Sequence, residues 1–148
     1  MRYLDQFLHN PILAPAITSW LVAQLLKLLL TLIFKRKLDL VRLIGAGGMP
    51  SSHSATVTTT AVTTGLVAGF DSLLFGIATV IALVVMYDAA GVRRAAGKQA
   101  KLLNELIDNY FSEHYINQAK LKELLGHTPI EVLAGALLGI IVSLAFYY

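Results

Sequence analysis

The sequence predicts an all-α fold: an integral membrane bundle of about four transmembrane helices, with one amphipathic helix at its cytoplasmic or interfacial side. The 148 residues are 56% hydrophobic and only 14% charged, whereas a soluble domain carries about 25% charged residues. Four segments approach the roughly 20 apolar residues that a helix needs to cross a bilayer. A fifth segment is polar and has helical periodicity. Residues 1–148 are expected to form a single membrane domain.

The four apolar segments are predicted to be membrane spans, and each carries few charges. Lys27 is the single charge of the first span, Asp88 comes near the end of the third, and Glu131 near the start of the fourth. The second span is rich in Thr, Ala and Gly. Its small residues at every fourth position favour close helix packing, and its threonines are expected to hydrogen-bond back to helix carbonyl groups. The spans are residues 12–34, 54–70, 73–91 and 129–148.

The segment between the third and fourth spans, residues 92–127, is the one part that looks soluble. Its apolar residues recur at helical spacing. This pattern predicts an amphipathic helix that lies at the membrane surface or over the bundle. The apolar positions are Leu102, Leu103, Leu106, Ile107 and Phe111.

The basic residues are distributed unevenly about the predicted membrane. With four spans, the connections 35–53 and 92–127 share one side, and they carry four and six of the twelve Lys and Arg residues. The positive-inside rule makes this side cytoplasmic and places both termini outside. No basic stripe is interleaved with aromatic residues, so no nucleic-acid partner is expected.

Polar residues of all four spans are expected to converge near the cytoplasmic ends of the helices. A charge inside a span is costly and indicates a functional site. Lys27 lies about 10 Å below the end of its helix, and Gln24 shares its face. We therefore predict one pocket, although snorkelling of Lys27 and capping by His127 would also account for single positions. The other polar residues at this level are His53, Asp88, Arg93, His127 and Glu131.

The loop G-G-M-P-S-S-H-S at residues 47–54 suits an anion, and phosphate is the natural one. Small residues let the backbone approach a ligand, and a helix N-terminus offers N–H groups to it. Two histidines provide a nucleophile and a proton donor for cleavage of a phosphate ester. Glu131, four residues after His127, is placed to hold its imidazole tautomer. The predicted phosphate contacts are Gly48, Ser51, Ser52, Lys27, Arg42 and Arg93.

Three blocks of sequence resemble the divergent type 2 phosphatidic acid phosphatase family of small membrane proteins. They are G-G-M-P-S-S-H-S-A at 47–55, Y-D-A-A-G-V-R at 87–93 and G-H-T-P-I-E-V-L-A-G at 126–135. The resemblance implies that His127 forms a phosphohistidine, that Glu131 orients it in place of the usual Asp, and that His53 protonates the leaving oxygen. It implies no metal and no other cofactor.

The chain departs from the superfamily pattern at several positions. Lys35 and Arg42 have the spacing of its first motif, but Leu43 replaces the proline, so Lys27 competes with Lys35 for the lysine role. Leu121 stands where the last motif has an arginine. We expect Arg93 to fill that gap with Asp88 fixing its guanidinium. Ser52 replaces the motif's glycine.

The sequence therefore predicts a membrane phosphatase that hydrolyses a lipid phosphate or diphosphate monoester at the cytoplasmic face. Phosphatidylglycerophosphate, phosphatidate and an isoprenyl phosphate are the candidate substrate types. Its partners would be this substrate and membrane lipids, and assembly into a homo-oligomer is left open. The alternatives are a non-catalytic lipid-phosphate binder and a small ion-coupled transporter built around Lys27 and Asp88.

Overall fold

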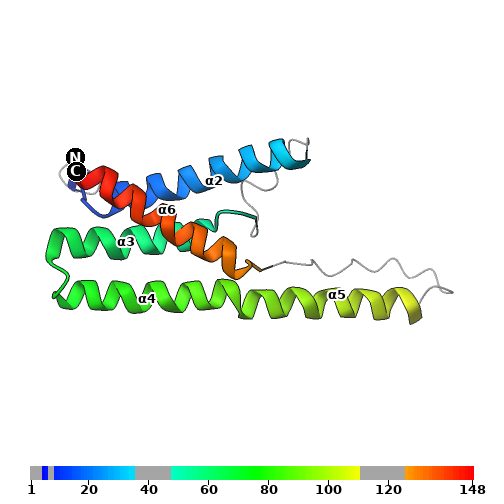
Figure 1. Cartoon of the computed structure of the whole chain (residues 1–148). Helices are drawn as coiled ribbons and strands as arrows, with labels where there is room; N and C mark the ends of the chain where they lie inside the picture. Colours follow the sequence, from blue (N-terminus) through cyan, green and yellow to red (C-terminus); the bar gives the residue numbers. More distant parts are fainter. Residues whose placement is uncertain (1–4, 7–8, 36–47, 111–125) are drawn as a thin grey trace.

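The computed structural model describes residues 5–6, 9–35, 48–110 and 126–148, without the side chains at 34, 35, 93, 94 and 108–110. This part of the chain is helical and contains no strand. Its helices begin and end within two residues of the four expected segments, and a further helix follows α4 directly (Figure 1). In chain order they are α2 (Leu13–Lys35), α3 (Ser52–Ala68), α4 (Leu73–Ala90), α5 (Val92–Tyr110) and α6 (Pro129–Tyr147).

Side-chain caps explain where three of these helices begin. Ser51 and Ser72 are the N-caps of α3 and α4, and each side chain accepts a hydrogen bond from a backbone N–H of the first turn. Thr128 and Glu131 form a capping box at the start of α6, with Pro129 as its first residue. A proline is favourable there because its missing N–H would have no intrahelical acceptor. Each cap satisfies donors that the first turn of a helix leaves unpaired.

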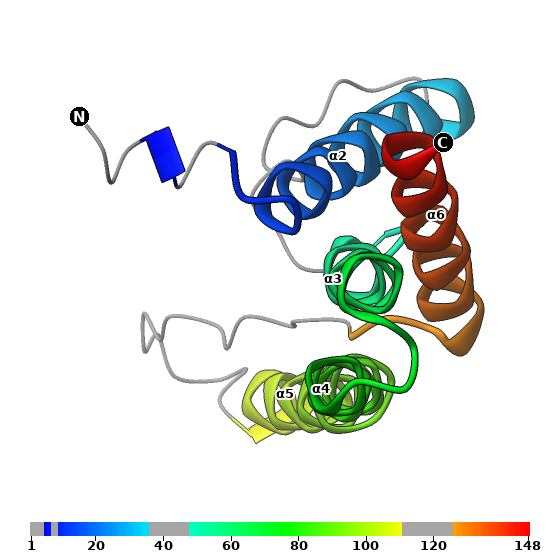
Figure 2. The same cartoon turned by 90° about the vertical axis from the view of Figure 1, so that its left-hand side faces the viewer.

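Helix α3 occupies the centre of the bundle and packs against α2, α4 and α6 (Figure 2). The predicted small-residue stripe, Ala55, Thr59 and Thr63, is buried. On the facing side of α6, a Cβ atom at Gly139 would lie 2.6 Å from the carbonyl oxygen of Ala55 and 2.9 Å from the Cβ of Thr58. The two backbones therefore approach too closely for any larger residue, as at small-residue interfaces in membranes.

The connections group at the two ends of the bundle. The start of α2, the C-terminus and the turn between α3 and α4 lie at one end (Figure 1). The end of α2, the start of α3, the end of α4 and the start of α6 point the other way. This is the arrangement that four alternating antiparallel helices require, and it gathers the predicted polar residues at one end.

Three helical stretches are long and apolar enough to cross a membrane among the residues described. They are Leu13–Ile33, Leu73–Ile107, which continues from α4 into α5, and Pro129–Tyr147. Helix α3 is not one of them, because it has 17 residues and many threonines. Its length of about 25 Å is slightly less than a bilayer core of about 30 Å. A fourth span at α3 therefore stays a prediction.

Helix α5 differs from the sequence prediction in its direction. It continues along the axis of α4 beyond the bundle, whereas the sequence led us to expect a helix lying on the bundle or the membrane surface (Figure 1). Only Gly91 separates the two helices, and its N–H still bonds to the carbonyl oxygen of Tyr87. The apolar side chains Leu102, Leu103 and Leu106 are exposed. Periodicity thus predicted the amphipathic character of this helix, but not where it points.

Candidate functional site

The two predicted catalytic histidines lie next to each other. His53 is in the first turn of α3, and His127 comes just before the cap of α6. Their ring centroids are 6.1 Å apart, and the ring planes meet at 64°. Both rings are therefore within reach of one small ligand, although they are too far apart to hydrogen-bond to each other.

Glu131 fixes the ring of His127. The Nδ1 atom of His127 lies 3.0 Å from Oε2 of Glu131. An ionised carboxylate oxygen only accepts, so this contact assigns a proton to Nδ1, and in the neutral imidazole Nε2 then carries the lone pair. The same Oε2 atom also accepts the backbone N–H of Thr128 at 3.2 Å. The capping box of α6 therefore also orients the imidazole.

The Nε2 atom of His127 is buried and has no hydrogen-bond partner among the described residues. The whole side chain is only 2% exposed. Buried polar atoms are nearly always hydrogen-bonded, so one without a partner indicates a ligand, a water or a catalytic role. Glu131 contacts the other ring nitrogen, so Nε2 is the atom of His127 that stays available to a ligand.

Two backbone hydrogen bonds tie the histidine-bearing segments together. Ser51 donates its N–H to the carbonyl oxygen of Glu131 at 3.0 Å, which joins the start of α3 to the start of α6. His127 donates its N–H to the carbonyl oxygen of Ala89 at 3.0 Å, which joins the start of α6 to the end of α4. Three helix ends therefore hold the two imidazoles in place.

The P-S-S-H loop leads directly into the first turn of α3. Gly48 has a φ of 89°, a conformation that favours glycine. The Ser51 hydroxyl is buried and accepts hydrogen bonds from the backbone N–H and the hydroxyl of Ser54, at 3.3 and 3.0 Å. Ser51 thus caps α3. Ser52 is also buried, at 5% exposure. Phosphate contacts by Gly48, Ser51 and Ser52 stay predictions.

Lys27 is buried inside the bundle. It is 2% exposed, and its Nζ donates to Oε1 of Gln24 at 2.9 Å. Gln24 is itself 7% exposed, so the predicted pair exists. Burial of a cation is expensive unless it has polar partners. The position of Lys27 on α2 is consistent with the predicted polar end of the bundle, and its role towards phosphate stays a prediction.

The remaining predicted contacts involve residues whose positions the structure gives only in part. Asp88 is half-buried near the end of α4, directly before the Ala89 carbonyl that binds His127. Arg93 belongs to α5, but its side chain lies outside the described part, as does the whole of Arg42. The Asp88–Arg93 pair therefore stays a prediction. Within the described ranges, no group of three or more His, Cys, Asp or Glu could hold a metal ion.

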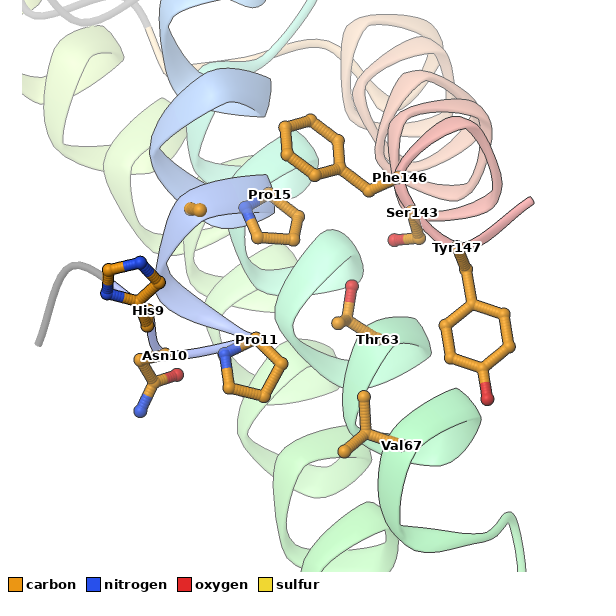
Figure 3. Close-up of a pocket in the computed structure, with 10 residues that line it drawn as sticks. His9, Asn10, Pro11, Pro15, Thr63, Val67, Ser143, Phe146 and Tyr147 are labelled. Carbon is orange, nitrogen blue, oxygen red and sulfur yellow. The ribbon is translucent and has the colours of Figure 1, made fainter. Parts of the chain in front are cut away.

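A separate cavity of 280 Å³ lies at the opposite end of the bundle, between the ends of α2, α3 and α6 (Figure 3). None of the predicted site residues lines it. Thr63 reaches this cavity with a buried hydroxyl that has no partner in the described structure. His9 stands at its rim, exposed, with Nδ1 2.8 Å from the carbonyl oxygen of Asp5. This cavity is therefore separate from the paired histidines.

Sequence reasoning missed three features that build the site. The first is the capping role of Thr128, although Thr-x-x-Glu at 128–131 is a recognisable capping-box pattern. The second is the Gly-x-x-x-Gly pair, Gly135 and Gly139, which allows α6 to approach α3. The third is the carbonyl oxygen of Ala89, for which no side-chain pattern gives a signal.

The helices have apolar outer faces and enclose a buried lysine and two adjacent histidines at one end. These features define a membrane protein with a polar site in its interior. The chain belongs to the family described as "Divergent PAP2 family", whose model matches residues 8–142. This confirms the family resemblance that the motifs predicted. The chain is also similar to the protein named "Uncharacterized membrane protein YuiD" from Bacillus subtilis (strain 168). The two are 40% identical over 156 residues, covering 97% of this chain and 98% of that protein. No solved structure matches the chain significantly.

Proposed function

We propose that the protein is a membrane lipid phosphatase that hydrolyses a lipid phosphate or diphosphate monoester through a phosphohistidine on His127. One observation carries this proposal: the Nε2 atom of His127 is buried without a partner in the described structure, while Glu131 holds Nδ1. Membership of a PAP2 family supports the same chemistry. Phosphatidylglycerophosphate, phosphatidate and isoprenyl phosphates are the candidate substrates.

In the proposed reaction, Nε2 of His127 attacks phosphorus and the bond to the lipid oxygen breaks. His53 gives its proton to the departing oxygen, and a water then attacks the phosphohistidine to release phosphate. General acid catalysis of this kind contributes about 10²–10⁴-fold to a rate. Glu131 stabilises the positive charge that His127 gains on attack. The N-terminus of α3, with Lys27, Arg42 and Arg93, would bind the phosphoryl oxygens.

The proposed site opens on the cytoplasmic side. The support is the charge count, since ten of the twelve Lys and Arg residues lie in the two connections at the histidine end. Both termini would then lie outside. This orientation suits lipid phosphates that are made inside the cell and presented in the inner leaflet.

The experiment is a phosphate-release screen with the purified protein and the three substrate types in detergent. The His127→Ala variant should lose release completely, and no acid-labile phosphate should be trapped on it from labelled substrate. The His53→Ala variant should be slowed by about 10²–10⁴-fold. His9→Ala is the matched control, because His9 is exposed at the other end of the bundle. Wild-type rates in His127→Ala, or no release from any substrate by the wild type, would contradict the proposal.

A non-catalytic lipid-phosphate binder is the second candidate, and one observation favours it. The Ser51 hydroxyl caps α3, and Ser52 replaces the motif's glycine. The loop that would bind phosphate therefore departs from the superfamily pattern. The same screen separates the two functions. A binder would retain a lipid phosphonate in a pull-down, but it would release no phosphate from any of the substrates.

A further inference from the structure

An apolar groove of 240 Å³ lies between α3 and α4, on the outside of the bundle. Helix α3 contributes Val57, Thr60 and Thr64 to its walls, and α4 contributes Leu74, Ile77, Ala78 and Ile81. Ile12, the residue before α2, completes the lining. No residue of the histidine site lines it. The described structure leaves this hollow open to the side, where a bilayer would surround the helices.

The walls of the groove share their helix faces with the polar site. Val57, Thr60 and Thr64 follow His53 by four, seven and eleven residues, which places all four on one face of α3. On α4, Ile81, Ile77 and Leu74 precede Asp88 by seven, eleven and fourteen residues, again on one face. Both helix faces therefore lead to a polar residue at the same end of the bundle. The groove itself begins at Val57 and Ile81, about 6 and 10 Å along the helices from His53 and Asp88.

The chemistry of the walls suits hydrocarbon. The hydroxyls of Thr60 and Thr64 donate to the carbonyl oxygens of Thr56 and Thr60, at 2.9 and 2.7 Å. Their hydrogen-bonding capacity is thus used within α3, and their methyl groups remain to form contacts. Ile77 and Ile81 are 58% and 54% exposed, which in a membrane protein means exposure to lipid chains.

We propose that this groove holds one hydrocarbon chain of the lipid whose phosphate lies between His53 and His127. The inference rests on the proposed function and specifies its substrate: a phosphate with an extended chain of at least about 16 Å, the rise of α3 from His53 to Thr64. A second chain, where the lipid has one, stays in the bilayer. Because the chain moves from lipid to protein, the groove selects it by shape and packing rather than by the hydrophobic effect.

The test is binding of alkylphosphonates, which are not hydrolysed, to the purified protein in detergent, with chain length as the variable. Ile81→Trp fills the groove. Leu83→Trp is its matched control, because Leu83 is 58% exposed two residues away and does not line the groove. The wild type and Leu83→Trp should bind long chains more tightly than short ones. Ile81→Trp should lose affinity for long chains by about tenfold, the scale of overpacking, and should bind the shortest phosphonate normally.

A blocking residue placed further along the groove sharpens the test. Leu74→Trp should spare chains of intermediate length and weaken only the longest, since Leu74 lies seven residues further from Asp88 than Ile81 does. Equal chain-length profiles in Ile81→Trp and Leu83→Trp would overturn the groove proposal, as would failure of the wild type to distinguish chain lengths. Phosphonate binding without any phosphate release would instead contradict the proposed phosphatase, so the two failures are distinguishable.

Discussion

At the residue scale, Glu131 combines a structural and a chemical task in one carboxylate oxygen. Oε2 accepts the N–H of Thr128 at 3.2 Å and contacts Nδ1 of His127 at 3.0 Å. A helix cap needs only an acceptor, which glutamine also supplies. Stabilisation of an imidazolium needs negative charge. The two tasks therefore respond differently to a change that removes only the charge.

We expect Glu131→Gln to fold with nearly wild-type stability and to lose phosphate release by about 10²–10⁴-fold, by analogy with loss of the carboxylate in a catalytic triad. The measurements are thermal unfolding by circular dichroism in detergent and initial rates of phosphate release. Thr128→Ala is the control, because it removes the cap hydroxyl that accepts the N–H of Glu131 and should cost about 1 kcal/mol of stability. Unchanged activity in Glu131→Gln would refute the proposed role.

The threonines of α3 offer a second contrast between neighbouring residues. The Thr59 hydroxyl lies 2.8 Å from the carbonyl oxygen of Ala55 and 3.1 Å from that of Gly139. The Thr63 hydroxyl is buried and has no partner within the described ranges. Threonine and valine have similar shapes, so replacement of each by valine removes only the hydroxyl.

Thr59→Val should therefore lower the free energy of unfolding by about 0.6–1.7 kcal/mol, the range for hydrogen bonds between membrane helices. Thr63→Val should leave stability unchanged or raise it, because an unsatisfied buried hydroxyl is removed. Unfolding of both variants in mixed micelles, measured side by side, checks the difference. Equal destabilisation would mean that Thr63 has a partner in the membrane, such as water in the cavity of Figure 3.

At the scale of elements, the contact between α3 and α6 fixes the site. A Cβ atom at Gly139 would lie 2.6 Å from the Ala55 carbonyl oxygen, and one at Gly135 would press on the Ser51 carbonyl and lie 2.9 Å from the Ser54 Cβ. Ser51 is the residue that bonds to Glu131. Any separation of these helices therefore also separates His53 from His127.

Gly135→Ala and Gly139→Ala should both destabilise the protein, by about 1–3 kcal/mol for overpacking of a tight contact. Both should also reduce phosphate release in the fraction that remains folded. Gly76→Ala is the matched control, since no atom lies within 4 Å of a Cβ built there; better helix propensity should make it neutral or slightly stabilising. Equal effects at Gly76 and Gly139 would show that helix propensity, rather than close packing, sets the stability of this interface.

The helices and the meeting of the histidines could be predicted from the sequence, because both follow from short-range patterns. Apolar segment lengths locate α2, α4 and α6, and alternating spans must bring His53 and His127 to one end. The direction of α5 could not be predicted, since periodicity describes a helix face and not its axis. The bond from His127 to the Ala89 carbonyl was equally inaccessible, because backbone acceptors are the same at every residue. The capping of α3 by the Ser51 hydroxyl was not predicted either, while its contact with phosphate stays a prediction.

At the scale of the whole molecule, the bundle has two unlike ends. The histidine end carries the buried lysine and adjoins the connections with ten basic residues. The other end carries the start of α2, the C-terminus, the turn between α3 and α4, and the cavity of Figure 3 (Figure 1). This polarity suggests one orientation in the membrane, and the number of spans decides whether the two termini share a side.

The chain has no cysteine, so single cysteines report this topology without background. Four exposed positions are suitable: Asp5, Asp71, Lys98 and Tyr148. With four spans and the histidine end inside, a membrane-impermeant maleimide added to intact cells should label Asp5→Cys, Asp71→Cys and Tyr148→Cys. Lys98→Cys should react only after permeabilisation. Detergent-solubilised protein, in which all four should react, is the control for reactivity.

Any other labelling pattern of the four cysteine variants indicates a different topology. If Asp5→Cys and Tyr148→Cys react from opposite sides, the chain has an odd number of spans, and α3 lies within the bundle without crossing, as its 17 residues permit. If Lys98→Cys alone reacts in intact cells, four spans hold but the paired histidines face outward. The basic connections would then reflect binding of an anionic ligand rather than the positive-inside rule, and the lipid phosphate would have to reach the protein in the outer leaflet.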